Sequence, residues 1–528
     1  MNQKRLKIYS WLLIAIGFIF TANTYWLLQL GYHYPLYDLR RVISLFFLGS
    51  LTLLGIIIPS INARIQFIWQ QIPKWIHYAI GVFFVIGLVS SIHAQLPRYA
   101  LLQLTLYIFL IFSAFVIAAF VQLWGKTNWG WLMSILGLSI AGLCITQYYL
   151  IGQWLINIHT VAQQGFKFNI SDKVIERVTK HPTFTNIRFL SQALSWTWPI
   201  LVLPLMDQQS NKIRYCLWAI PFFVLASIWW SIAWGNESRA LMLEWVIIPL
   251  LVLAIYRKLG LHWLKWQILT AAVGFILFLV VNHHLVPHMV DQIKPNTHHH
   301  VTSAANDSTA DSATKSSSQF SSHYRLYIYY VASKLAWNHP ILGVGPMHFA
   351  YEAWPLLQGK SGVAKVAHPH SLWLYIASDW GFIALALLLA VFIKSIFSII
   401  KQSIREINDY RLSIARVCVA SSFAAAMFHA CFSGILIMPL SQALLVIICG
   451  WMLALYLPQS NEPEHVNVIP WIVSAVIMLV AASLFIYGIY PTWDNWIYLI
   501  THYRSETGRV DVLPPNFWSQ GFIYFWPK

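Results

Sequence analysis

The chain has 528 residues, of which 58% are hydrophobic and only 10% are charged. Soluble domains are about 25% charged on average, so this composition excludes an ordinary soluble protein and indicates an integral membrane protein. The net charge of +16 comes without any basic, aromatic RNA- or DNA-binding module, which excludes nucleic acid as the expected partner. Anionic lipid head groups are the expected counter-charge.

Apolar runs near the ~20 residues that cross a bilayer predict an all-α protein with about 12–13 transmembrane helices. No cleavage site follows the first run, so it is expected to remain as the first span. We find no internal repeat, and residues 1–528 are expected to form a single polytopic membrane domain. The runs cover about residues 8–30, 42–61, 75–93, 99–124, 129–150, 189–206, 216–234, 239–256, 266–286, 371–393, 412–434, 438–457 and 470–490.

The short loops predict the orientation, because Lys and Arg collect on the cytoplasmic side. With the N-terminus inside, only Arg40, Arg41, Arg98 and Arg239 fall in the short outer loops. Loops 151–188 and 287–370 and the tail after residue 490 then lie outside the cytoplasm. The basic residues of the inner connections are Lys4, Arg5, Lys7, Arg64, Lys74, Lys126, Lys212, Arg214, Arg257, Lys258, Lys265, Lys394, Lys401, Arg405 and Arg411.

The large loop over 287–370 is expected to be periplasmic and to have two distinct parts. Residues 296–322 are rich in Ser, Thr, Ala and Asp with few large apolar groups, which predicts a flexible segment. Residues 324–338 place apolar side chains at helical spacing before a proline, which predicts an amphipathic helix against the membrane surface. The tail over 491–528 is aromatic and is also expected to be periplasmic.

The histidines differ in their surroundings. Residues 298–300 are a consecutive histidine tract in the low-complexity segment, without the rigid surroundings that a metal site needs, so no metal or other cofactor is expected. His429 lies within a span, where a hydrogen bond between helices is the simpler interpretation. His368 and His370 flank a proline immediately before a new span. Either imidazole is suited to act as a general base on a hydroxyl at this boundary, and local chemistry does not choose between them.

Three arginines begin elements at the same predicted membrane boundary: Arg188, Arg239 and Arg325. Guanidinium groups match phosphate oxygens, so these residues beside a general base predict a diphosphate site. Each one alone is explained equally well by contact with lipid phosphates. Glu244 and Asp379 lie inside predicted spans, where a carboxylate is costly unless paired, and are expected to orient an arginine or a histidine.

The segments NHPILGVGPMHF and HPHSLWLYIASDWGFIA resemble the signature of the O-antigen ligase and polymerase superfamily, which includes bacterial protein (pilin) O-oligosaccharyltransferases. The ligase pattern is a His followed by Asn, Ser or Gln, nine residues, and Gly-x-x-Gly. Here His370 and Ser371 are followed by nine residues and Gly381, while Ala384 replaces the second glycine. The similarity is strongest over about residues 180–400.

The resemblance implies a C-type glycosyltransferase architecture and an inverting, metal-independent transfer from a polyprenyl-diphosphate-linked glycan. It implies that His370 is the base and that His368 orients the site or assists. Arg188, Arg239 and Arg325 would bind the diphosphate. The implied location is the bacterial inner membrane, with the site facing the periplasm.

The acceptor stays open between three hydroxyls: Ser or Thr of an exported protein such as a pilin, lipid A core, and another O-antigen repeat unit. The length of the chain and its aromatic tail favour a protein acceptor. A lipid-linked sugar flippase or other transporter is the alternative from a different class. Such a protein is expected to carry polar residues along a pathway through several spans, whereas the candidate residues here gather at one face.

Overall fold

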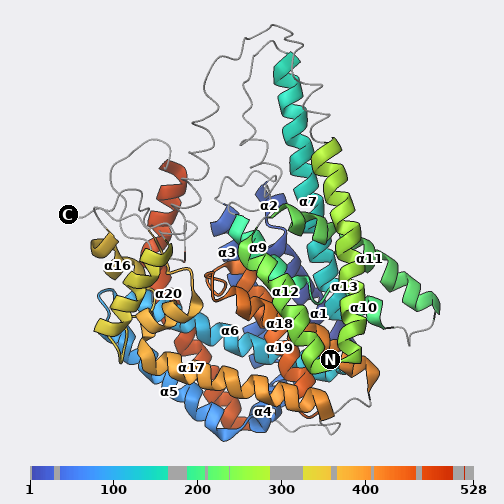
Figure 1. The fold of residues 1–528 in the computed structure, drawn as a ribbon. Helices are drawn as coiled ribbons and strands as arrows, with labels where there is room; N and C mark the ends of the chain where they lie inside the picture. Colours follow the sequence, from blue (N-terminus) through green and yellow to red (C-terminus); the bar gives the residue numbers. More distant parts are fainter. Residues whose placement is uncertain are drawn as a thin grey trace.

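The computed structural model describes residues 3–28, 36–163, 187–207, 212–236, 238–285, 325–357, 366–405, 409–459, 467–502 and Phe517, and their regular structure is entirely helical (Figure 1). Eleven of the described helices are long and apolar enough to cross a membrane, and Ile8–Ala22 is a shorter apolar helix. The predicted all-α membrane fold is confirmed, with eleven candidate spans in these ranges against 12–13 expected.

The helices are α1 (Gln3–Ala22), α2 (Tyr25–Leu28), α3 (Leu36–Ile57), α4 (Pro59–Gln71), α5 (Lys74–His93), α6 (Pro97–Trp124), α7 (Gly130–Gln163), α9 (Ile187–Thr197), α10 (Leu203–Met206), α11 (Lys212–Gly235), α12 (Arg239–Tyr256), α13 (Lys258–Leu279), the π-helix η1 (Val280–Leu285), α16 (Phe349–Leu357), α17 (Leu372–Arg405), α18 (Tyr410–His429), α19 (Pro439–Tyr456) and α20 (Val468–His502). A further helix covers residues 325–338.

The span expected over 189–206 is interrupted. It consists of α9, an irregular segment and the short α10, because prolines at 199 and 204 remove helical N–H donors. Carbonyl groups freed by the interruption are bound from α13. Trp263 Nε1 donates to the Pro199 carbonyl at 3.0 Å, and Gln267 Nε2 donates to the Trp198 carbonyl at 3.1 Å. Irregular backbone at membrane depth is tolerated where protein partners satisfy it in this way.

The centre of the bundle is formed by α6, α18 and α19, most of whose residues are buried. Helix α6 packs on α19 and α20, α18 packs on α9, α12 and α19, and α5 packs on α17 (Figure 1). In contrast, α5, α13, α17 and α20 bury few of their residues, as expected of helices that face lipid.

The end of the bundle where α17 begins, just after His368 and His370, is called the histidine end below. Consecutive spans run in opposite directions, so α9, α12 and α19 also begin there and α18 ends there. The helix over 325–338 covers this end. It buries an apolar face that includes Ile328 and Val331 and leaves Trp337 exposed.

Two predicted segments fall largely outside the described residues. The flexible segment over 296–322 lies outside them altogether. Of the tail over 491–528, the structure describes the continuation of α20 to His502 and Phe517 alone.

Candidate active site

His368 and His370 lie together at the entry to α17. Their ring centroids are 4.4 Å apart, and the rings meet at 75°. The His370 backbone N–H donates to Nδ1 of His368 at 3.1 Å, so His368 carries its proton on Nε2. His370 has a φ of +55°, a left-handed conformation that costs energy for a residue other than glycine. The strained backbone brings both rings to one place.

Arg188, at the start of α9, is in contact with His370. Its Nη1 lies 3.3 Å from His370 Nε2, and because a guanidinium can only donate, Nε2 is the acceptor and the His370 proton is on Nδ1. Tyr329 Oη donates to the His370 carbonyl at 3.4 Å. The structure therefore brings together two predicted site residues that are 182 positions apart in the sequence.

Burial and cationic neighbours keep both imidazoles neutral. Burial lowers the pKa of His370 well below 6.5, and His368, Arg188 and Arg325 lower it further. Burial, with the charge of Arg188, lowers the pKa of His368 to about 3. Arg325 thus lies close enough to act on His370 electrostatically. A neutral imidazole is the form that can accept a proton.

Arg239, the third predicted arginine, is exposed at the first turn of α12. Among the described residues it makes no hydrogen bond to either histidine, and it is not among the charges that shift the pKa of His370. The structure therefore places Arg188 in contact with His370, Arg325 within electrostatic reach of it, and Arg239 at the same end of the bundle.

The loop between α18 and α19 forms the floor beneath the histidines. A Cβ added to Gly434 would lie 2.6 Å from Cε1 of His368, so the loop packs directly on that ring. Arg41, from α3, holds the loop by donating to the Ile437 carbonyl at 2.5 Å. From the sequence, Arg41 was expected only as a basic residue of a short outer loop, and no local pattern distinguishes it from its neighbours.

Asp379 was expected to orient an arginine or a histidine, but its hydrogen bonds reach the backbone at the start of α16. It is fully buried, and its Oδ1 accepts the backbone N–H of Phe349 at 3.1 Å, at the start of α16. Backbone bonding from Met347, which has a φ of +68°, also reaches this carboxylate. Asp379 thus holds the turn before α16, and no described contact joins it to a histidine or arginine of the site.

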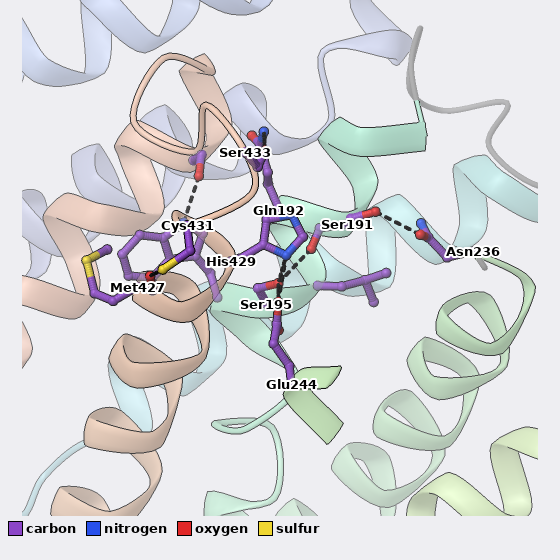
Figure 2. Close-up of polar contacts among 12 residues, drawn as sticks. Ser191, Gln192, Ser195, Asn236, Glu244, Met427, His429, Cys431 and Ser433 are labelled. Atoms are coloured by element: carbon purple, nitrogen blue, oxygen red, sulfur yellow. Dashed lines mark hydrogen bonds and ion pairs between the residues drawn. The ribbon is translucent and has the colours of Figure 1, made fainter. Parts of the chain in front are cut away.

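Glu244 lies inside the bundle, below the histidine end. Its Oε1 is 2.6 Å from Nδ1 of His429 and accepts a hydrogen bond from Ser195 Oγ at 3.0 Å (Figure 2). The predicted pairing of Glu244 with a histidine is therefore present in the structure, and its partner is His429, the residue that the sequence left as an interhelical contact.

Gly381 explains the spacing of the motif in physical terms. It has a φ of +84° and breaks α17 into two helical pieces. The loop over 340–345 occupies the break: Val344 N donates to the Ser378 carbonyl at 2.8 Å, and Phe382 N donates to the Pro340 carbonyl at 2.7 Å. Nine residues separate Gly381 from the His370-Ser371 pair. The length of the first helical piece of α17 therefore fixes the distance between the histidines and the break.

Residues 222–389 match the family described as Wzy_C, O-antigen ligase. No curated protein matches the chain. The matched range includes both histidines, Arg325, Glu244 and the break in α17, and it begins after Arg188. The chain is therefore a multi-pass membrane protein that carries an O-antigen ligase family domain, Wzy_C, over residues 222–389.

Proposed function

We propose that the chain transfers a glycan from a polyprenyl-diphosphate carrier to a hydroxyl, with His370 as the general base. The contact between Arg188 and His370 is the observation that supports this most directly, because it places an anion-binding group beside a neutral imidazole. Arg188 and Arg325 bind the diphosphate, with Arg239 as an outer charge, and His368 orients the base through the His370 backbone.

The proposed step needs no metal and balances its atoms. The acceptor oxygen attacks the anomeric carbon from the face opposite the diphosphate, and the bond from that carbon to the phosphate oxygen breaks, which inverts the anomeric configuration. The hydroxyl proton passes to Nε2 of His370, and the arginines stabilise the charge of the departing diphosphate. Because Nη1 of Arg188 lies at Nε2 of His370, Arg188 must turn toward the phosphates of the donor before Nε2 can accept the proton.

The proposed acceptor is a Ser or Thr of an exported protein such as a pilin, at the periplasmic face of the inner membrane. The excess of basic residues in the opposite loops supports this orientation. Lipid A core and a further repeat unit are the alternative acceptors. A transporter is disfavoured because the histidines, Arg188 and Arg325 lie at one end of the bundle rather than along a pathway.

Comparison of cells with and without the gene tests the acceptor. Exported proteins are analysed by mass spectrometry and lipopolysaccharide by gel. Loss of a glycan from a protein, with lipopolysaccharide unchanged, supports the protein acceptor. Loss of O-antigen from lipid A core with proteins unchanged identifies a ligase, and cores carrying one repeat unit in place of a long chain identify a polymerase.

Replacing Arg188 with alanine is expected to weaken binding of a polyprenyl diphosphate by about tenfold or more, since a hydrogen bond to a charged group contributes roughly 1.5–3 kcal/mol. The affinity of the purified protein for a glycan-free polyprenyl diphosphate measures this. Lys334→Ala is the control, because Lys334 is an exposed cation on the covering helix. Equal weakening by both substitutions would point to a general charge effect and against a diphosphate site at Arg188.

The pH dependence of kcat/KM reports the free enzyme, in which burial and neighbouring cations lower the pKa of His370 well below 6.5. A lowered pKa means that the ring stays neutral, and competent, as the pH falls through 6.5. Transfer from lipid-linked donor is therefore expected to have a flat kcat/KM near neutrality and an acid limb below pH 6.5. In Arg188→Ala the limb should move upward, because one cation that opposes protonation is gone. An acid limb above 6.5 in the native chain would argue against His370 as the base.

A further inference from the structure

Three polar side chains form a buried group that the mechanism above does not use. Ser195 of α9, Glu244 of α12 and His429 of α18 are each at most 3% exposed. Figure 2 shows them converging, with Glu244 Oε1 2.6 Å from His429 Nδ1 and 3.0 Å from Ser195 Oγ. We call these residues the Glu244 cluster. A buried carboxylate is often no more stabilising than a well-packed apolar side chain, so its presence suggests a demand for defined geometry.

Two of the three helices that form the cluster, α9 and α18, also reach the histidine end. On α9, Arg188 precedes Ser195 by seven residues, which places them on one face about 10 Å apart along the axis. On α18, the residue that follows His429 accepts the backbone N–H of Leu372 at 2.8 Å, two residues after His370. The cluster thus joins α9, which carries Arg188, to the end of α18, which binds the backbone just after His370.

A second polar contact lies between the cluster and the site. Gln192 Nε2, one turn after Arg188 on α9, donates to Ser433 Oγ at 2.7 Å (Figure 2). Ser433 precedes Gly434, which packs on the ring of His368. Hydrogen bonds therefore fix helix α9 at two successive levels, to the loop between α18 and α19 at Gln192 and to α12 and α18 at Ser195.

We propose that Glu244, through His429 and Ser195, is a positioning residue that fixes α9 against the end of α18 and so keeps the start of α9, which carries Arg188, beside His370 and within reach of the diphosphate. Apolar packing alone is non-directional and leaves a helix free to shift along its neighbour, whereas hydrogen bonds define the register. A displacement of about 1 Å in a reacting constellation can cost on the order of 10²-fold in rate. The inference rests on the proposed role of Arg188 in holding the diphosphate.

The test measures the affinity of the purified full chain for a glycan-free polyprenyl diphosphate in Glu244→Ala, Glu244→Gln, Arg188→Ala and the double variant Glu244→Ala/Arg188→Ala. Glu244→Ala is expected to weaken binding by about tenfold, as coupled neighbours do. Glu244→Gln keeps an oxygen that can accept hydrogen bonds from Ser195 Oγ and from Nδ1 of His429, so it should stay within about threefold of the native chain. In the double variant, loss of Glu244 should add little, because it acts through Arg188.

Arg416→Gln is the matched control for general destabilisation. Arg416 is buried in the same helix as His429, toward its other end, and donates to the Leu455 carbonyl at 2.9 Å. This variant should lose thermal stability but keep native affinity. Ser195→Ala removes a single hydroxyl and replaces Glu244→Ala in the test if that variant fails to fold. Its affinity for the polyprenyl diphosphate is expected to be lower than that of the native chain. The pH dependence of binding should be unchanged in all the Glu244 and Ser195 variants.

The outcomes separate this inference from the proposed function. Native affinity in Glu244→Ala and Ser195→Ala, with weak binding in Arg188→Ala, overturns the positioning role and leaves the diphosphate site intact. Native affinity in Arg188→Ala overturns the diphosphate site itself. Glu244→Gln as weak as Glu244→Ala, or a full additional loss in the double variant, would show that the charge of Glu244 acts directly and not by positioning.

Discussion

Replacing His370 with alanine is expected to lower glycan transfer by about 10²- to 10⁴-fold, the usual contribution of a general base. The acceptor hydroxyl then keeps its proton during attack, and no other described group takes its place at this position, since Nδ1 of His368 is bound by the His370 backbone. Transfer from an excess of lipid-linked donor, measured at equal amounts of purified protein, gives the ratio of kcat values. Donor affinity should change little, because His370 does not bind the diphosphate.

His368→Ala and His339→Ala complete this comparison. His368 shapes the backbone at His370, so its loss should reduce transfer less than the loss of the base itself. His339 is exposed in the preceding loop and controls for removal of a histidine. If His370→Ala and His368→Ala both transfer at the native rate, the mechanism is wrong.

Replacing Gly381 with valine is expected to destroy both the fold of the site and transfer. A Cβ at this position would lie 2.4 Å from the Ile341 carbonyl oxygen and 2.9 Å from that of Pro340, and the φ of +84° is unfavourable for a β-branched residue. Strain and overpacking together should cost at least about 3 kcal/mol. Yield of monodisperse protein, its thermal midpoint and its transfer activity measure the effect.

Gly81→Val is the matched control, because Gly81 lies in the middle of α5 with nothing within 4 Å of its virtual Cβ. It changes the same residue type in a spanning helix without touching the loop over 340–345. Normal yield and transfer are expected for this variant. A Gly381→Val protein that behaves like Gly81→Val would mean that the break in α17 does not position the histidines.

The fold class followed from hydropathy, since apolar length alone identifies most spans. The prolines at 199 and 204 were visible within the span expected over 189–206, but local composition did not reveal how the interrupted backbone is satisfied, because that depends on donors from α13. Trp263 and Gln267 stand more than 60 residues after the carbonyls that they satisfy, and the sequence offers no means to pair them. The break in α17 was similarly hidden, although Gly381 was visible as part of the motif.

For the candidate site, the sequence indicated which residues to examine but not which of them are in contact. The pairing of Arg188 with His370 depends on how α9 packs on α18 and α19, and the pairing of Glu244 with His429 depends on how α12 packs on α18. Asp379 appeared equivalent to Glu244 as a carboxylate in a span, yet its contacts serve the backbone before α16. The catalytic and binding roles of these residues stay predictions until the variants are measured.

The loop over 340–345 has a consequence for how large substrates enter. Its backbone is bonded to the carbonyls opened at Gly381, and Ser90 of α5 donates to the Leu342 carbonyl at 2.6 Å. Separation of this loop from α17 would leave several backbone groups unsatisfied close to the membrane, each at a cost of several kcal/mol. This wall of the site is therefore held in place by its backbone hydrogen bonds, and we expect the widening that admits a bulky glycan or acceptor to come from movement of the covering helix over 325–338.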